Sequence, residues 1–110
     1  MTAADDQRNL RDQFYEAMLN IYKRALSVAK YPATRFLQMV NEYGGVETAR
    51  ILLHAPAVFD GYTALYLKNR LDLTVEAVIH DNEKWHPLFT EQELEICVTR
   101  LTDYRYLSAN

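Results

Sequence analysis

Four residues near the middle of the second half of the chain carry side chains that can bind a metal ion or transfer a proton. They are His80, Asp81, Glu83 and His86. Imidazole and carboxylate groups are common ligands of zinc and related metals. Their spacing matches no structural zinc pattern, however, and helix ends commonly collect histidine and aspartate as capping residues. We therefore interpret the cluster as part of a helix end and predict no metal and no cofactor.

The remaining reactive side chains also have structural explanations. Asp72 and Glu76 are one helical turn apart, which would suit paired-carboxylate chemistry. Asp72 also fits a helix cap, and Glu76 fits the acid that a helix dipole favours in its first turn. Cys97 has acidic neighbours rather than the cations that activate a thiol, and His54 ends a predicted helix. With no glycine-rich phosphate loop or nucleophile motif, we predict that the chain is not an enzyme.

The composition is typical of one folded domain, which we place over residues 1–110. The 110 residues are 49% hydrophobic and 25% charged, with a net charge of −3. A single cysteine excludes an internal disulfide and fits a reducing compartment. Neither a signal peptide nor a membrane span of about 20 apolar residues is visible. The expected location is the cytoplasm.

A long amphipathic helix is predicted over residues 5–30, which contain no glycine or proline. Two apolar stripes recur along it at helical spacing. The first comprises Leu10, Phe14, Ala17, Ile21, Ala25 and Val28, and the second comprises Tyr15, Leu19, Tyr22 and Leu26. One stripe can enter the core of the chain, whereas the second needs either a later helix or a second subunit.

A compact helical core is predicted over residues 32–103, followed by a partly frayed tail over 104–110. Helices are expected over 33–43 and 46–55, with Pro32 in the first turn of the former and Gly44-Gly45 ending it. Asp60 is expected to cap a short helix, and Asp72 or Thr74 the next. A loop is expected over 81–87. Thr90 and Glu93 form the capping box of the last helix. The fold class is therefore all-α, a bundle of five or six helices with a long N-terminal helix.

Four motifs resemble a small bacterial all-helical domain that occurs alone and at the ends of longer proteins. They are Tyr43-Gly44-Gly45-Val46-Glu47-Thr48-Ala49, Asp60-Gly61-Tyr62-Thr63-Ala64-Leu65, Arg70-Leu71-Asp72-Leu73-Thr74-Val75-Glu76-Ala77 and Leu88-Phe89-Thr90. They cover less than half of the chain, and residues 1–35 lie outside them. The resemblance implies a helical module and no particular activity.

Protein–protein interaction is the function that these features favour. The second stripe of the first helix (Tyr15, Leu19, Tyr22 and Leu26) predicts a homodimer or a protein partner, because monomers seldom expose a large apolar patch. The chain has eight tyrosines, a residue type enriched at interfaces. Trp85, in the expected loop, is a further candidate anchor. Tyrosines that merely line the edge of the core with their hydroxyls in water are an equally good explanation.

Nucleic-acid binding is the alternative. Helices over 33–43 and 46–55 around a glycine turn have the outline of a helix-turn-helix. The acid-free stretch between Ala17 and Asn41 supplies Lys23, Arg24, Lys30 and Arg35, to which Arg50 adds a cation on the second helix. Such cations can contact phosphates. The second helix also carries acid, and cations near the end of the first helix complement its dipole.

Overall fold

The first helix, α1 (Ala3–Ala29), runs along most of the molecule in the computed structural model, which describes the backbone of residues 3–108 and the side chains of residues 6–108. Its 27 residues span about 40 Å at 1.5 Å per residue, close to the longest dimension of 43 Å. The helix ends at Ala29, and the next residue, Lys30, has a left-handed φ of 58°.

The other elements are short helices joined by tight turns. They are α2 (Thr34–Tyr43), α3 (Gly45–His54), α4 (Asp60–Leu67), the 3-10 helix η1 (Leu71–Leu73), α5 (Val75–Asp81), the 3-10 helix η2 (Glu83–Leu88) and α6 (Glu91–Asp103). No strand occurs within residues 3–108. The predicted fold class, all-α with a long N-terminal helix, is confirmed.

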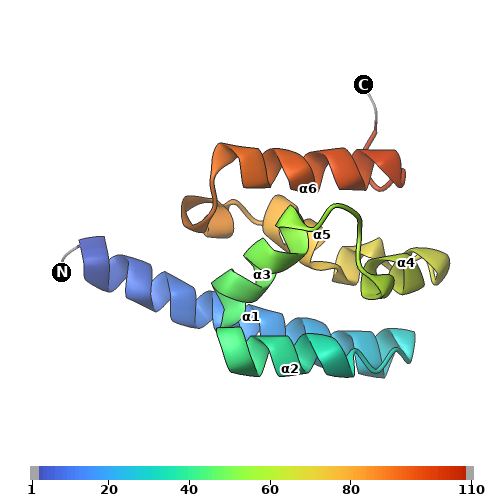
Figure 1. The fold of residues 1–110 in the computed structure, drawn as a ribbon, viewed down its shortest axis with the longest axis horizontal. Coiled ribbons are helices and arrows are strands. Elements are labelled where there is room, and N and C mark those ends of the chain that lie inside the picture. The colour runs from blue at the N-terminus through green and yellow to red at the C-terminus, as the bar shows by residue number, and fades with distance from the viewer. Residues whose placement is uncertain (1–2, 109–110) are drawn as a thin grey trace.

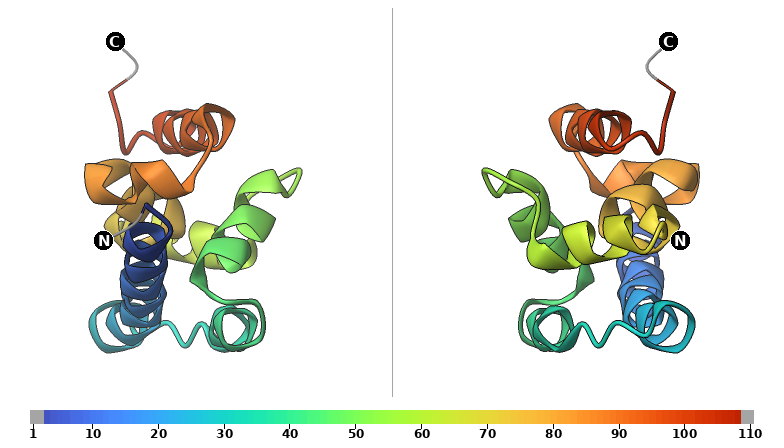
Figure 2. Two further views of the ribbon diagram at one scale, coloured as in Figure 1. Left: turned by 90° about the vertical axis from the view of Figure 1, so that its left-hand side faces the viewer. Right: turned by 90° about the vertical axis from the view of Figure 1, so that its right-hand side faces the viewer.

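The helices stack around α3, which crosses the middle of the molecule. α2 turns back beside the C-terminal half of α1, and α3 then leads from this pair toward α6 (Figure 1). α5 packs under α6, and α4 lies beyond it near the C-terminal end of α1 (Figures 1 and 2). Because α3 contacts α1, α2 and α6, it connects the two halves of the fold.

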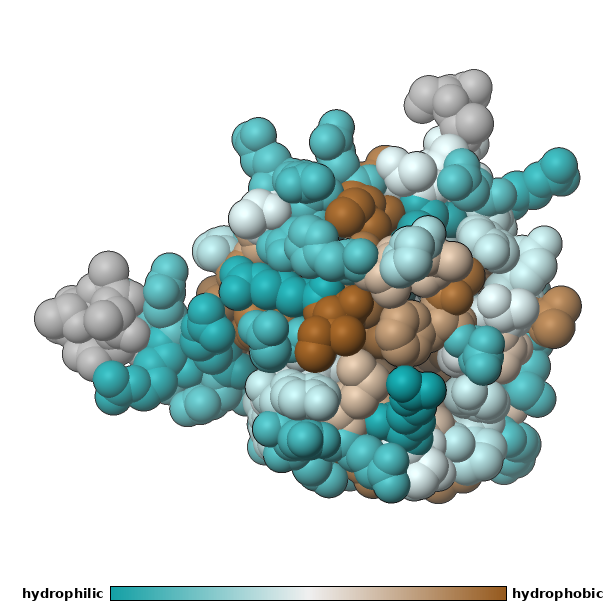
Figure 3. Space-filling model, viewed as in Figure 1, coloured by the Kyte–Doolittle hydropathy of each residue, from teal (hydrophilic) through white to brown (hydrophobic). Residues whose placement is uncertain are grey.

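An aromatic cluster forms the centre of the main core. Phe14 of α1 meets Trp85 and Phe89 edge to face, with ring centroids 5.3 Å and 5.4 Å apart. Such edge-to-face pairs are a favoured aromatic geometry. The surface in Figure 3 is mainly hydrophilic, with apolar side chains gathered over α3 and the start of α4.

The buried face of α1 differs from the predicted first stripe. Met18 and Ala29 are buried, whereas Ala17 is only half-buried and Val28 is exposed. With 3.6 residues per turn, the positions three and four residues after Phe14 or Ala25 lie on either side of the same face. Packing against α3 and η2 therefore decides which of the two enters the core.

The prediction that Trp85 lies in a loop and anchors a partner is wrong. The expected loop over 81–87 contains the end of α5 and most of η2, and Trp85 is only 6% exposed. The Lys84 ammonium lies 5.2 Å from the centre of its ring. Since Phe14 and the main core enclose the indole, Trp85 is not available as an anchor for a partner.

The tail is also more ordered than predicted as far as Leu107. Tyr104 packs edge to face on Tyr62 and Tyr66. The amide of Tyr106 donates to the Leu101 carbonyl over 2.8 Å, with Arg105 in the left-handed region at φ 65° between them. Three of the eight tyrosines, Tyr62, Tyr66 and Tyr104, therefore pack on one another within the chain. Residues 109–110 lie outside the described residues.

The predicted helix boundaries are partly correct. Thr90 and Glu93 form the expected capping box, and Thr74 caps α5. Gly44 ends α2 with φ 86°, a conformation that favours glycine. Asp60, by contrast, is the first residue of α4 rather than its cap, which is Phe59. Pro32 likewise precedes the cap of α2, Ala33, and does not lie in the first turn.

Candidate functional site

The cluster between His80 and His86 does not converge on one point. His80 Nδ1 lies 2.9 Å from Asp81 Oδ1, and the Tyr106 hydroxyl donates to Asp81 Oδ2 over 2.5 Å. His86 Nε2 instead lies 2.9 Å from a backbone carbonyl of α5, and Glu83 opens η2. Among residues 6–108, no group of three histidine, cysteine or acidic side chains is placed to hold a metal ion. These contacts tie η2 and the tail to α5.

Asp72 and Glu76 lie in different environments and do not act as a pair of carboxylates. Arg70 donates to both carboxylate oxygens of Asp72, over 2.9 Å and 2.8 Å, and this hydrogen bonding lowers the pKa of Asp72. Glu76 is buried and lies 3.0 Å from Arg100. Burial raises the pKa of Glu76, while hydrogen bonds, including that from Arg100, oppose the rise.

Arg100 is the centre of a buried network that sequence reasoning missed. Its Nη1 donates to Glu76 Oε2 and to the Leu52 carbonyl, both over 3.0 Å. Its Nη2 donates to the carbonyls of Leu53 over 3.2 Å and Ala55 over 2.9 Å. The last carbonyls of a helix have no partner within the helix. Arg100 therefore caps the C-terminal end of α3 from α6 and neutralises the buried acid of α5.

A second network joins α3 to the start of α6 through Glu93. One carboxylate oxygen accepts the Thr90 amide over 2.8 Å, and the other lies 2.8 Å from His54 Nε2 and 3.4 Å from Arg50 Nε. Burial alone would raise the pKa of Glu93, but these hydrogen bonds and the Arg50 charge outweigh it and lower the pKa. Arg50 also donates to the Leu88 carbonyl over 3.0 Å. It is thus bound within the chain rather than free to contact a phosphate.

Cys97 is fully buried in the main core. Burial, with a contribution from the charge of Glu76, raises the pKa of its thiol to about 12. A thiol is nucleophilic as its thiolate, so Cys97 has a packing role.

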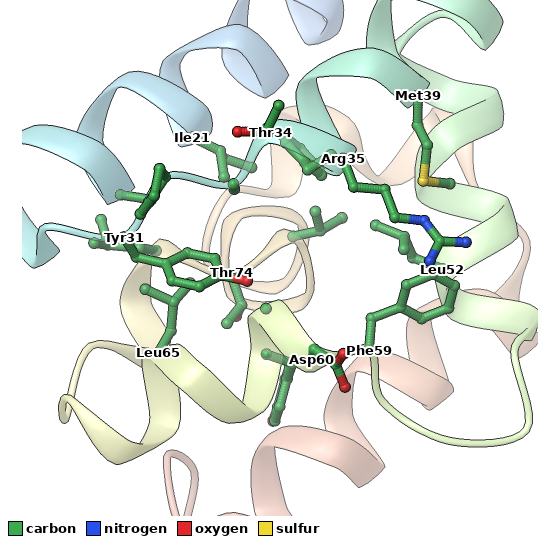
Figure 4. Close-up of a pocket in the computed structure, with 18 of the residues that line it drawn as sticks. Ile21, Tyr31, Thr34, Arg35, Met39, Leu52, Phe59, Asp60, Leu65 and Thr74 are labelled. Atoms are coloured by element: carbon green, nitrogen blue, oxygen red, sulfur yellow. The ribbon is translucent and has the colours of Figure 1, made fainter.

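A pocket of about 300 Å³ lies between the C-terminal end of α1, α2, the end of α3, α4 and the η1–α5 turn. Its walls are mainly apolar and aromatic (Figure 4). They include Ile21, Ala25, Tyr31, Phe36, Met39, Leu52, Phe59, Leu65, Leu73 and Val75. Because these residues come from distant segments, no local sequence signal marks the pocket. This volume is at the lower limit of small-ligand pockets, which measure about 300–1,000 Å³.

Polar groups occupy the rim and one wall of the pocket. Arg35 and Asp60 line its edge, and both are exposed. Figure 4 shows the Arg35 guanidinium reaching toward the ring of Phe59, with Asp60 nearby. Within residues 6–108, neither Arg35 nor Asp60 forms a salt bridge. Glu76 also lines the pocket, but its charge is already matched by Arg100.

The second stripe of α1 is covered at one end and open at the other. Tyr15 and Leu19 pack on the main core, and the Tyr15 hydroxyl donates to Asn41 Oδ1 of α2 over 3.3 Å. Tyr22 is half-buried, and Leu26 is 42% exposed. α2 therefore supplies much of the partner surface that the sequence left open, and the exposed part of the stripe centres on Leu26.

The predicted basic residues do not form one surface. Lys23 and Arg24 are exposed on α1, and Arg35 lies on the pocket rim. Lys30 follows α1, and its ammonium donates to the Ser27 carbonyl over 3.0 Å. Arg50 lies apart from them, in the Glu93 network.

Comparisons with known proteins add no relative: no family model, no curated protein and no solved structure matches the chain. The resemblance of the four motifs to a bacterial helical domain therefore stays a prediction. Within the described residues, each helix is too short or too polar to cross a lipid bilayer. The fold and its pocket define the chain as an all-α domain with an open apolar pocket.

Proposed function

We propose that this chain is a non-enzymatic interaction domain, which binds another protein by accepting apolar side chains of that protein in the α1–α2–α4 pocket. The observation that carries the proposal is the pocket itself: an apolar recess of about 300 Å³ with exposed polar groups at its rim. Apolar pockets with a polar rim are the usual location of the residues that dominate protein–protein affinity.

The roles of the reactive side chains support a binding function over a catalytic one. Glu76 and Glu93 are engaged in networks that join helices, and Cys97 is enclosed by the core. In the His80–His86 cluster, His80 and Asp81 contact each other and His86 contacts a backbone carbonyl. A nucleophile beside a base, or an acid and a base facing one cavity, would be expected of an enzyme.

Site-specific photo-crosslinking in the native host tests the proposal. A photoreactive residue at Thr34, which is exposed on the pocket rim, is compared with the same residue at Thr99, which is exposed on α6. We expect discrete adducts from Thr34 and none of the same size from Thr99. Identical adducts from both positions, or none from Thr34, would contradict a partner bound at the pocket.

Self-association through α1 is kept as a prediction, with Leu26 as its main exposed contact. Leu26→Ser should then shift sedimentation toward monomer, whereas Ser27→Ala, at the next exposed position, should leave it unchanged. The cytoplasm likewise stays the expected location, on the evidence of the single cysteine.

Nucleic-acid binding stays the alternative, because Lys23 and Arg24 are exposed on α1. Its support is weaker since α3, the expected recognition helix, packs against three other helices and Arg50 is bound internally. Lys23→Ala with Arg24→Ala should weaken binding to duplex DNA or to RNA and reduce its salt dependence. Absence of binding to either at low salt would eliminate this alternative.

A further inference from the structure

The edge of the pocket carries two opposite charges that form no salt bridge within residues 6–108. They belong to Arg35 of α2 and Asp60 of α4, both of which are exposed. Figure 4 shows the ring of Phe59 between the two groups. Glu76, the third charged residue that lines the pocket, is already matched by Arg100. The edge is therefore neutral in total, with its positive and negative charge on different helices.

Arg35 occupies a position where its own helix does not stabilise a cation. It is the second residue of α2, close to the positive end of the helix dipole. No acidic residue occurs within residues 31–39, so no neighbour one helical turn away can neutralise it. Asp60, in contrast, lies in the first turn of α4, where the dipole favours an acid. Both groups are open to charges supplied from outside the chain.

We infer that the occupant of the pocket is a segment of another protein that carries an apolar anchor between an acidic and a basic residue. The acid lies beside Arg35, the base lies beside Asp60, and the anchor enters the apolar recess. This inference rests on the proposed function and specifies the chemistry of the partner. Planar guanidinium groups pair well with carboxylates, and complementary charges fix the register of an interface. The two charges therefore set the direction in which the segment crosses the pocket.

A partner with charges of only one sign fits this edge less well. A purely acidic segment would bring a like charge to Asp60, and a purely basic segment would bring one to Arg35. Like charges placed together across an interface weaken association. Nucleic acid meets the same difficulty, since its phosphates would approach Asp60. The mainly apolar walls also offer few groups to the edges of bases, which is where proteins read sequence.

Selection from a random dodecapeptide phage library supplies a probe for this inference. Peptides are selected on the wild-type domain, and the tightest one is titrated by fluorescence anisotropy and by NMR. We expect leucine, isoleucine or phenylalanine with an acidic residue on one side and a basic residue on the other, in the same order in most selected peptides. The NMR shift changes should centre on the walls, at Phe36, Phe59 and Leu65.

Exchanging the two charges of the edge tests their pairing without changing the net charge of the domain. Arg35→Glu and Asp60→Lys should each raise the dissociation constant of the selected peptide about fivefold, because each replaces an exposed ion pair with a repulsive one. The double variant should instead prefer a second peptide, in which the acid and the base are exchanged. A gain of binding by the exchanged peptide cannot result from loss of structure.

A matched double variant controls for charge exchange elsewhere on the surface. Arg8→Glu with Asp12→Lys, at exposed positions in the N-terminal half of α1, should change both dissociation constants less than about twofold. Asp60→Lys places a cation in the first turn of α4, so circular dichroism and melting temperature are measured for each variant. If it does not fold, Arg35→Glu with a peptide whose acid alone is replaced by lysine makes the same test.

The outcomes distinguish failure of this inference from failure of the proposed function. Peptides that shift the pocket resonances but respond equally to both double variants would overturn the charge pairing and leave the proposed function intact. A folded Arg35→Glu, Asp60→Lys variant that still prefers the original peptide would do the same. Free phenylalanine that binds as tightly as the peptide would overturn the inference in favour of a small zwitterion. If no peptide shifts the pocket resonances and Thr34 gives no adduct, both proposals fail.

Discussion

Replacing Arg100 with methionine is the most informative perturbation of this fold. Methionine retains an unbranched apolar side chain but removes the donors to Glu76 and to the carbonyls at the end of α3. The Glu76–Arg100 pair is well enclosed, with side chains only 6% and 13% exposed. Breaking a buried pair by removing one partner costs about 3–5 kcal/mol. We therefore expect a loss of about 4 kcal/mol, a large fraction of the roughly 5–15 kcal/mol that stabilises a domain.

The stability lost in Arg100→Met should increase with pH. Burial raises the pKa of Glu76 above its ordinary value. An acid whose folded-state pKa is raised adds stability below its unfolded pKa, and this stability is lost as the pH rises through the folded pKa. Removing Arg100 takes away its hydrogen bond and its charge, both of which favour the ionised carboxylate, so the pKa of Glu76 rises further. The deficit of Arg100→Met should thus be largest at mildly alkaline pH and smaller at mildly acidic pH.

Urea denaturation of Arg100→Met and of the control Arg8→Met at both pH values measures these effects. The control removes an exposed arginine and should change stability by less than about 0.5 kcal/mol. Adding Glu76→Gln to Arg100→Met should restore part of the stability and remove most of the pH dependence. If Arg100→Met is as stable as Arg8→Met, or if its deficit is the same at both pH values, the assignment of this network is wrong.

Four further predictions concern single residues. Thr48 Oγ1 is buried and has no hydrogen-bond partner among the described residues, so Thr48→Val should raise the free energy of unfolding by about 1 kcal/mol. A loss of stability in urea denaturation would show that the hydroxyl is satisfied. The Cys97 thiol, with its pKa raised to about 12 by burial, should react with a thiol reagent only at the rate of unfolding; rapid labelling of the folded protein would contradict this. Gly44 has φ 86° with open space around it, so Gly44→Ala should destabilise by about 1–3 kcal/mol through backbone strain alone. Gly61→Ala, within α4 and in ordinary contact range of Tyr31, should be neutral or slightly stabilising by thermal denaturation.

The elements that sequence reasoning predicted correctly depend on local chemistry. The Thr90 capping box and the glycine at the end of α2 require only residues a few positions apart. Trp85 shows the limit of this approach. Its charged neighbours and nearby proline resemble a loop, yet Phe14, far away in sequence, provides the surface that buries it.

The candidate site could not be predicted from sequence for the same physical reason. The pocket is assembled from segments as distant as Ile21 and Val75, none of which carries a motif for it. Arg35 was identified as a cation, but its position on a rim depends on how α2 packs beside α1. Arg100 showed no local signal at all, because its partners lie in α3 and α5. Local sequence patterns therefore predicted the helices, whereas the pocket and the Arg100 network depend on tertiary contacts between distant segments.

The order of α3, α5 and α6 along the chain has a consequence for folding during synthesis. A ribosome releases α3 and α5 well before α6, so during that interval the last carbonyls of α3 and the acid of Glu76 have no cation to satisfy them. The nascent domain should consequently remain loosely packed until Arg100 emerges, and then close in one cooperative step. A chain that stops before α6 should be less stable, because Glu76 and the carbonyls of Leu53 and Ala55 lose their donor. α3 and α5 should therefore reach their final packing only when Arg100 of α6 is present.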